Sequence, residues 1–277
     1  MPPSREFSIG SVRAGGGQPF FLVAGPCVIE SESHATMLAE RLCAVTRELG
    51  VPLIFKASYD KANRTSLYSY RGPGLVKGLE ILRRIRERFG APVLTDVHEV
   101  AHVGPAAEVC DVLQVPAFLC RQTDLLLAVG KAGRAVNLKK GQFLSPMEMA
   151  HAVEKVASTG NERILVTERG TSFGYQNLVV DMRSFPMLRQ LGYPVVFDVT
   201  HSVQLPGGRG AASGGQPEFI EPLARAGVAV GADGVFLEVH DNPSAALSDG
   251  TNALPLDRLS ALLKKLMALA QLVRQWS

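Results

Sequence analysis

The chain has 277 residues, of which 46% are hydrophobic, and a formal net charge of +3. This length can bury a large core, and a nearly neutral chain with interspersed charges is not typical of a nucleic-acid-binding protein. No apolar run approaches the roughly 18 residues that span a bilayer, and the N-terminal residues lack the pattern of a signal peptide. The four cysteines form no CxxC pair. We therefore expect a cytoplasmic globular protein with neither a nucleic-acid nor a membrane partner.

Short apolar runs of the strand type recur along the chain. Residues 7–20 predict an N-terminal hairpin with its turn near Gly15, Gly16 and Gly17. Eight runs follow, at residues 20–25, 52–58, 92–98, 112–117, 135–139, 164–169, 194–201 and 234–240. Helical patterns separate most of them, including residues 75–89, and a long one over 256–276 ends the chain.

Eight strands alternating with helices over about 250 residues are typical of a (β/α)8 TIM barrel. We expect one such domain over residues 1–277, since no linker-like change of composition interrupts the chain. A doubly wound open sheet is the alternative. It is disfavoured because the glycine-rich stretch at 207–215 lacks GxGxxG spacing and does not follow the first strand.

Nearly every predicted strand ends in a polar or reactive side chain. The residues at these ends are Cys27, Lys56, Asp96, Gln114, Lys139, Arg169, His201 and Glu238. In a barrel the carboxyl ends of all strands meet on one rim, where the active sites of such enzymes lie. Any one of these residues alone could be structural, but their shared position predicts a functional site.

Two groups can be distinguished among the residues near this rim. Five are cations, namely Lys56, Lys61, Arg64, Lys139 and Arg169. If unpaired they would repel one another, so they predict a ligand with more than one anionic group. The alternative is that Glu168 or Asp60 neutralises them.

The second group contains a thiol, an imidazole and two carboxylates, which are all ligands for divalent metals. Its members are Cys27, His201, Glu238 and Asp249. The first, seventh and eighth strands become neighbours when a barrel closes, so these side chains would meet. The mixture does not select one metal. His34 falls in a helical segment and receives no role, whereas His98 and His240 lie near strand ends and could support the site.

Residues 206–217 contain five glycines and one cation, Arg209. They follow the seventh strand at the rim and predict a loop that closes over the mouth, where Arg209 would contact a phosphate. A plain connection without a role is the alternative.

These motifs resemble the 3-deoxy-D-manno-octulosonate 8-phosphate synthase family from about residue 20 onward. The segments that carry the resemblance are AGPCVIES, FKASYDKANRTS, LTDVHE, LQVPAFLCRQTDLL, VNLKKGQF, TERGTSFGYQNLVVDMRS, DVTHSVQLPGG, GVFLEVH and LSDG. The resemblance implies a (β/α)8 barrel and a homotetramer with sites near subunit interfaces. The implied reaction condenses phosphoenolpyruvate with D-arabinose 5-phosphate and water and releases phosphate, for lipopolysaccharide biosynthesis.

The resemblance also implies roles for individual residues. The implied metal ligands are Cys27, His201, Glu238 and Asp249. A cysteine at position 27, where the metal-independent branch has asparagine, implies the metal-dependent branch with Zn, Fe, Mn or Co. The implied substrate-binding residues are Lys56, Lys61, Asn63, Arg64, Thr65, Gln114, Ala117, Lys139 and Arg169, with Arg209 added from the loop. We assign candidate catalytic roles to Lys61, Asp96, His201 and Asp249.

Three other functions remain possible at this level. A 3-deoxy-D-arabino-heptulosonate 7-phosphate synthase, which uses erythrose 4-phosphate, would share the barrel and metal set; the KANRTS segment argues against it, because those relatives have a KPRTS-like form. A metal-dependent hydrolase would not need five cations. A non-catalytic anion-binding barrel would bind phosphoenolpyruvate without turnover.

Overall fold

The computed structural model describes residues 4–64, 66–207 and 214–276. Among these residues, eight parallel strands form a closed barrel, because β11 pairs with β14 as well as with β8. The strands are β3 (Phe21–Gly25), β4 (Leu53–Lys56), β5 (Val93–Asp96), β6 (Val112–Val115), β7 (Ala135–Lys139), β8 (Ile164–Glu168), β11 (Val195–Asp198) and β14 (Gly234–His240). The predicted TIM barrel is therefore confirmed, and the open doubly wound sheet is excluded.

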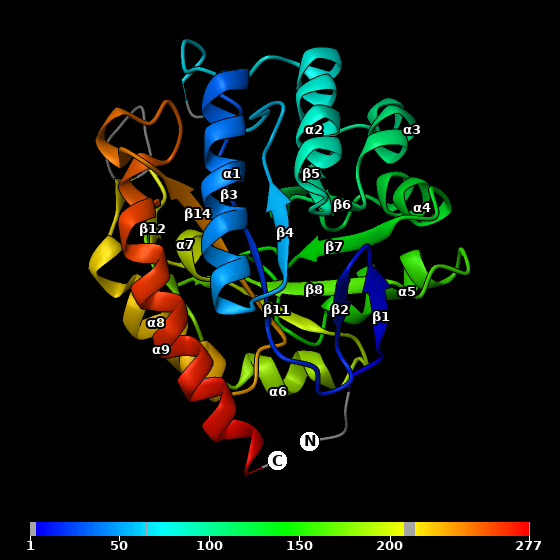
Figure 1. Ribbon diagram of the computed structural model, residues 1–277. Helices are drawn as coiled ribbons and strands as arrows, with labels where there is room; N and C mark the ends of the chain where they lie inside the picture. The colour runs from blue at the N-terminus through cyan, green and yellow to red at the C-terminus, as the bar shows by residue number, and fades with distance from the viewer. Residues whose placement is uncertain (1–3, 65, 208–213, 277) are drawn as a thin grey trace.

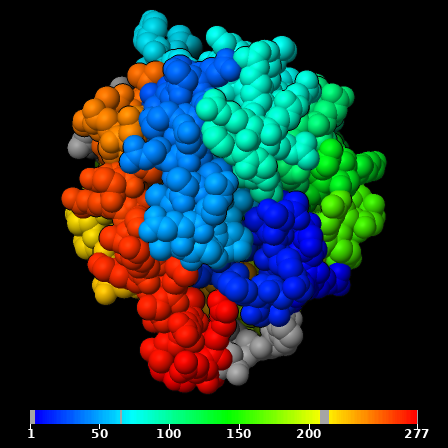
Figure 2. Space-filling view, in the orientation of Figure 1, coloured from blue at the N-terminus to red at the C-terminus, as the bar shows by residue number. Residues whose placement is uncertain are grey.

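Helices surround the barrel (Figure 1). They are α1 (Glu32–Leu49), α2 (Leu75–Phe89), α3 (Val100–Val109), α4 (Thr123–Lys131), α5 (Met149–Ala157), α6 (Ser184–Arg189), α7 (Val199–Ser202), α8 (Ile220–Ala229) and α9 (Leu256–Arg274). In the space-filling view α1, α2 and α9 form a continuous surface on one side of the molecule (Figure 2). None of the described helices is both long and apolar enough to cross a bilayer.

Shorter elements lie in the segments that connect the barrel strands and the helices. The 3₁₀ turns are η1 (Ala117–Leu119), η2 (Pro217–Phe219), η3 (Pro243–Ala245) and η4 (Gly250–Asn252). The short strands are β9 (Thr171–Ser172) with β10 (Leu178–Val179), β12 (Gln204–Leu205) with β13 (Gly214–Gly215), and β15 (Leu254–Pro255), which pairs in parallel with the end of β14.

Local sequence explains the start and end of α1, which follows the first barrel strand. Ser31 adopts an extended conformation and its Oγ accepts a hydrogen bond from the His34 backbone N–H at 3.1 Å. Gly50 ends the helix in the left-handed region, with φ of 67°. Between these caps, residues such as Leu38 and Leu42 are spaced to form one buried face.

Two apolar cores hold the barrel together. Side chains facing outward from the strands pack with the helices, while those facing inward fill the barrel interior. An N-terminal hairpin of β1 (Phe7–Ile9) and β2 (Val12–Ala14) contributes Ile9 and Val12 to the inner core. It packs near Pro92 at the amino end of β5, so the opposite, carboxyl end of the barrel is left for the site.

The hairpin was predicted, but its turn was misplaced. The chain reverses at Gly10, which has φ of 56°, and Ile9 pairs with Val12. The three glycines from Gly15 to Gly17 lie after the second strand and all have positive φ. Glycine content alone could not distinguish the turn from the segment that follows it, because both require left-handed backbone.

Candidate active site

The carboxyl ends of the barrel strands surround a cavity of about 960 Å³. Among the predicted site residues, those in its wall are Lys56, Lys61, Asn63, Arg64, Asp96, Gln114, Ala117, Lys139, Arg169, His201, Glu238 and Asp249. The barrel thus brings together side chains from strands and loops far apart in the sequence, as strand ends on one rim require. Thr65 and Arg209, which were predicted to bind substrate, lie outside the described residues, as do residues 208–213 of the predicted closing loop.

Cys27 is not among the residues of the cavity wall, but it contacts two of them in the loop that follows β14. Its Sγ lies 2.9 Å from Ser248 Oγ and 3.2 Å from Asp249 Oδ2, and both partners belong to the cavity wall. Burial raises the pKa of the thiol to about 12, against the opposing charge of Lys61. The thiol is therefore neutral by itself, and a bound cation would favour the thiolate.

The other two predicted metal ligands form a second contact. His201 Nε2 lies 3.5 Å from Glu238 Oε1. The second carboxylate oxygen of Glu238 is buried and has no hydrogen-bond partner among the described residues. Burial lowers the pKa of His201, which keeps its imidazole neutral and able to act as a ligand. The donor types of the four side chains and the unsatisfied carboxylate oxygen fit a divalent metal. The described structure holds the four as two separate pairs, however, and they are not a group whose ligand atoms all lie within 4.8 Å of one another.

Asp198 is a central residue of the site that the sequence analysis missed. It ends β11, is fully buried, and accepts hydrogen bonds from Lys139 Nζ and, at 2.7 Å, from His201 Nδ1. Burial opposes its ionisation, but the contacts with His201 and Lys139 lower its pKa below the ordinary value. By holding Nδ1, Asp198 directs the Nε2 of His201 toward Glu238. Its position at a strand end, three residues before His201, was an available signal.

Two of the five predicted cations have carboxylate partners inside the site. Lys56 Nζ lies 2.8 Å from Glu238 Oε1, and Lys139 is paired with Asp198. The expectation of five unpaired cations is therefore wrong for these two lysines. The two carboxylates considered as alternative partners form ion pairs with other cations. Glu168 contacts Lys140, and Asp60 contacts Arg71. Lysines this deeply buried need an internal counter-ion, which strand-end carboxylates supply.

Arg169 has no such partner among the described residues. Its Nη2 donates to Gln204 Oε1 at 2.8 Å, while its Nη1 is buried with no acceptor. Burial lowers the pKa of the guanidinium, although the nearby carboxylates of Asp198 and Glu168 counteract this effect. A buried arginine with an unused donor at a cavity wall is suited to a phosphate or carboxylate of a ligand.

Asp96 and Lys61 form the opposite part of the wall. Asp96 Oδ2 lies 2.8 Å from His98 Nε2. Burial raises the pKa of Asp96, but the His98 hydrogen bond and the neighbouring lysines lower it overall. Burial lowers the pKa of Lys61, but the carboxylates of Asp96, Glu238 and Asp249 surround the amine with negative potential and raise its pKa overall. Lys61 is therefore a protonated amine, able to donate a proton or hydrogen bond into the cavity.

Gln114 is held by a row of buried polar side chains across three strands. Asn137 Nδ2 donates to Gln114 Oε1 at 2.9 Å, and Thr167 Oγ1 donates to Asn137 Oδ1 at 2.6 Å. This row on β6, β7 and β8 fixes the orientation of Gln114 and leaves its amide nitrogen free to donate. Asn137 and Thr167 have a positioning role that residue types alone did not reveal.

Comparison with known proteins shows the family to which the chain belongs. The model of the DAHP synthetase I family matches residues 4–275. The chain is 62% identical over 271 residues to a 2-dehydro-3-deoxyphosphooctonate aldolase of Trichlorobacter lovleyi, covering 98% of this chain and 100% of that protein. Proteins with the same name from Geotalea daltonii and Geobacter sulfurreducens are 60% and 58% identical, over 98% of this chain and 99% and 100% of theirs. The chain therefore belongs to the DAHP synthetase I family.

Proposed function

We propose that this protein is a transferase that condenses phosphoenolpyruvate with D-arabinose 5-phosphate and water, giving 3-deoxy-D-manno-octulosonate 8-phosphate and phosphate. The names of its full-length relatives support this activity, since 2-dehydro-3-deoxyphosphooctonate aldolase denotes the same enzyme. The structural observation that carries the proposal is the buried guanidinium of Arg169, whose Nη1 has no partner among the described residues. Such a group at a cavity wall requires an anionic ligand.

In the proposed complex, Arg169 and Lys139 bind the phosphate of phosphoenolpyruvate from adjacent strands. Lys56, Lys61 and Gln114 donate to its remaining oxygens, with Ala117 packed nearby. Three facts support this arrangement: the residues share one cavity, Gln114 is held in place by Asn137, and Lys61 is kept protonated by its surroundings. Fixed donors of this kind reduce the cost of orienting the substrates.

Asn63, Arg64 and Thr65 would contact the pentose phosphate. Arg64 supports this role because its own partners are neutral carbonyl oxygens, those of Tyr70 and Leu247, both at 3.0 Å. Its charge is therefore available to a second phosphate.

The reaction then needs two bond-forming steps. The enol carbon of phosphoenolpyruvate attacks the aldehyde carbon, whose oxygen gains a proton and becomes a hydroxyl. Water adds to the electron-poor carbon that carries the phosphate, and the bond from that carbon to the phosphate oxygen breaks. Lys61 is positioned to donate the first proton, while Asp96 can hold or accept a proton at the water. His201 would act there as a ligand, because Asp198 occupies its Nδ1 and the metal would occupy its Nε2.

A divalent metal held by Cys27, His201, Glu238 and Asp249 would supply Lewis-acid chemistry toward the aldehyde or the water. We propose that the enzyme belongs to the metal-dependent branch, with Zn, Fe, Mn or Co as its ion. The unsatisfied oxygen of Glu238 and the neutral imidazole of His201 support this assignment. Asp198 would orient His201 in the metal-bound and metal-free states alike.

A comparison of sugar acceptors tests the proposed function. Purified enzyme should release phosphate from phosphoenolpyruvate rapidly with arabinose 5-phosphate and slowly with erythrose 4-phosphate. The reverse preference would assign the heptulosonate activity, which the description of the family also names. Phosphate release without either sugar would instead indicate a hydrolase, and binding without turnover would indicate an anion-binding protein.

We further propose that the enzyme is a homotetramer located in the cytoplasm, where both phosphorylated substrates are found. Large apolar side chains on loops beside the site support subunit contacts there. Tyr68, on the loop after β4, is 93% exposed, and Tyr175, on the loop after β8, is 100% exposed. Sedimentation of the purified protein would give the oligomeric state.

A further inference from the structure

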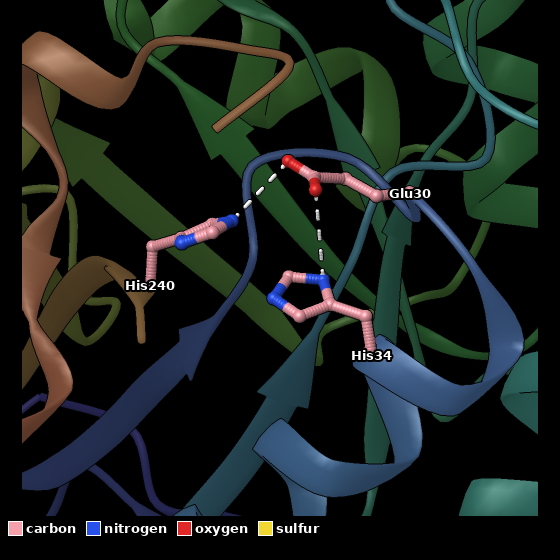
Figure 3. Close-up of side chains that lie close together, drawn as sticks. All are labelled: Glu30, His34 and His240. Atoms are coloured by element: carbon pink, nitrogen blue, oxygen red, sulfur yellow. Dashed lines mark hydrogen bonds and ion pairs between the residues drawn. The ribbon is translucent and has the colours of Figure 1, made fainter. Parts of the chain in front are cut away.

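A second group of side chains of the metal-ligand type lies at the rim, outside the proposed catalytic set. Glu30 belongs to the loop after β3, His34 to the first turn of α1, and His240 to the end of β14. In Figure 3 a dashed line joins the carboxylate of Glu30 to each of the two imidazole rings. All three side chains are largely buried, with exposed fractions of 16%, 15% and 7% in the same order.

The ligand atoms of these residues are already close enough to share one ion. They lie within 4.8 Å of one another. His240 Nε2 is 3.2 Å from Glu30 Oε1, and His34 Nδ1 is 3.9 Å from Glu30 Oε2. The ring centroids of the two histidines are 4.6 Å apart. Two imidazoles and a carboxylate form a donor set typical of zinc and other divalent transition metals.

The nitrogen of His34 that faces Glu30 has no hydrogen-bond partner. His34 Nε2 lies 2.9 Å from Asp241 Oδ1, so the imidazole donates its proton to that carboxylate. Its Nδ1 is then unprotonated and carries a lone pair, and this atom is buried without a hydrogen-bond partner among the described residues. A lone pair that faces a carboxylate is electrostatically unfavourable, and a cation between the two would make it favourable.

Asp241 completes the arrangement usual around protein-bound metals, in which a carboxylate holds the outer nitrogen of a histidine ligand. It lies 3.1 Å from His240 Nδ1 as well as against His34. His240 Nδ1 also accepts the backbone N–H of Asn242 at 2.9 Å. If a metal binds His240 Nε2, the imidazole proton must be on Nδ1. His240 then donates this proton to Asp241 and loses the hydrogen bond that Nδ1 accepts from the backbone N–H of Asn242.

We propose that Glu30, His34 and His240 bind a second divalent metal ion of the zinc class, with Asp241 orienting both histidines. This inference goes beyond the proposed catalytic activity and does not depend on it. The ion joins the loop after β3 to the segment after β14. Glu30 Oε1 already accepts the backbone N–H of Leu247 at 2.7 Å, two residues before Asp249. The second ion therefore anchors the chain segment that carries part of the active site.

Metal counting on the full-length protein tests this proposal. Protein freed of metal by chelation is dialysed against Zn²⁺, and the bound metal is measured per chain. Parallel titration with Co²⁺ distinguishes the sites, because only Cys27 gives a cobalt–thiolate charge-transfer band. The variants are His34→Asn at the new site and Cys27→Asn at the catalytic one. His151→Asn is the control, since His151 is an exposed helical histidine, 78% exposed.

The wild type and His151→Asn should bind two equivalents. His34→Asn should lose one equivalent and keep the thiolate band, whereas Cys27→Asn should lose the band and keep the other equivalent. Asp241→Asn should weaken the second site by about 10- to 100-fold. A wild-type protein that binds a single ion with a thiolate band, unchanged in both His34→Asn and Asp241→Asn, would overturn the proposal. If the wild type binds a single ion that gives no thiolate band and that His34→Asn no longer binds, the second site is supported. That result would contradict the proposed catalytic metal ligands instead.

Discussion

Arg169 offers a direct test of how the site binds anions, through the substitution Arg169→Met. Arg169 is 5% exposed, and its Nη1 has no partner among the described residues. Methionine keeps much of the apolar stem but removes the guanidinium. Losing one charged partner of a buried contact costs about 2–4 kcal/mol, so phosphoenolpyruvate binding should weaken roughly 30- to 900-fold. The sugar phosphate should be less affected. Arg163→Met, at the exposed amino end of the same strand, is the matched control.

The same substitution should have an unusual effect on stability. Because Arg169 has no direct carboxylate partner, removing it also removes the cost of burying an unpaired charge. The free energy of unfolding without ligand should therefore stay unchanged or rise. Lys56→Met, in contrast, breaks the buried ion pair with Glu238. This variant should lower the free energy of unfolding by about 3–5 kcal/mol.

Urea unfolding of the apo variants and steady-state kinetics with both substrates would measure these effects. A normal KM for phosphoenolpyruvate together with a normal kcat in Arg169→Met would refute the assignment of this residue. A loss of stability as large as that of Lys56→Met would show that Arg169 has a structural role. Normal kinetics in Arg163→Met are needed for either conclusion.

Three further predictions concern metal, pH and packing. Chelation should abolish activity and a divalent metal restore it, while Cys27→Asn should lower metal affinity; full activity in metal-free protein would contradict this. Burial lowers the pKa of His98, but Asp96 raises it overall, so the folded pKa exceeds the unfolded value of about 6.5. The stabilisation by His98 should be complete below that value and disappear as pH rises through the folded pKa. The free energy of unfolding would be measured for wild type and His98→Gln at about pH 6 and about pH 9. If the two proteins differ by the same amount at both pH values, His98 does not stabilise the fold in this way. Gly227→Ala places a Cβ 2.2 Å from Phe197 Cδ1 and should cost about 1–3 kcal/mol, and an unchanged urea midpoint would be inconsistent with this packing.

The sequence alone determined the barrel and the rim on which the site lies. Apolar runs such as 135–139 are continuous because strands of a parallel barrel are buried on both faces, so each strand was recognisable by itself. The start and end of α1 likewise depend on local residues, since Ser31 caps its first turn and Gly50 ends it. Once eight strands were counted, their carboxyl ends had to converge, which placed Lys139 and His201 at one cavity without further information.

Only the tertiary structure decided which side chains pair with one another. A strand end predicts that a residue reaches the rim, but not which carboxylate neutralises it. Lys139 is paired with Asp198, which lies two strands away in the barrel and 59 residues further along the chain. Likewise, the helical position of His34 gave no sign that it faces Glu30 and His240. Such contacts depend on burial and on the distance between elements remote in sequence, and the spacing of residues along the chain records neither.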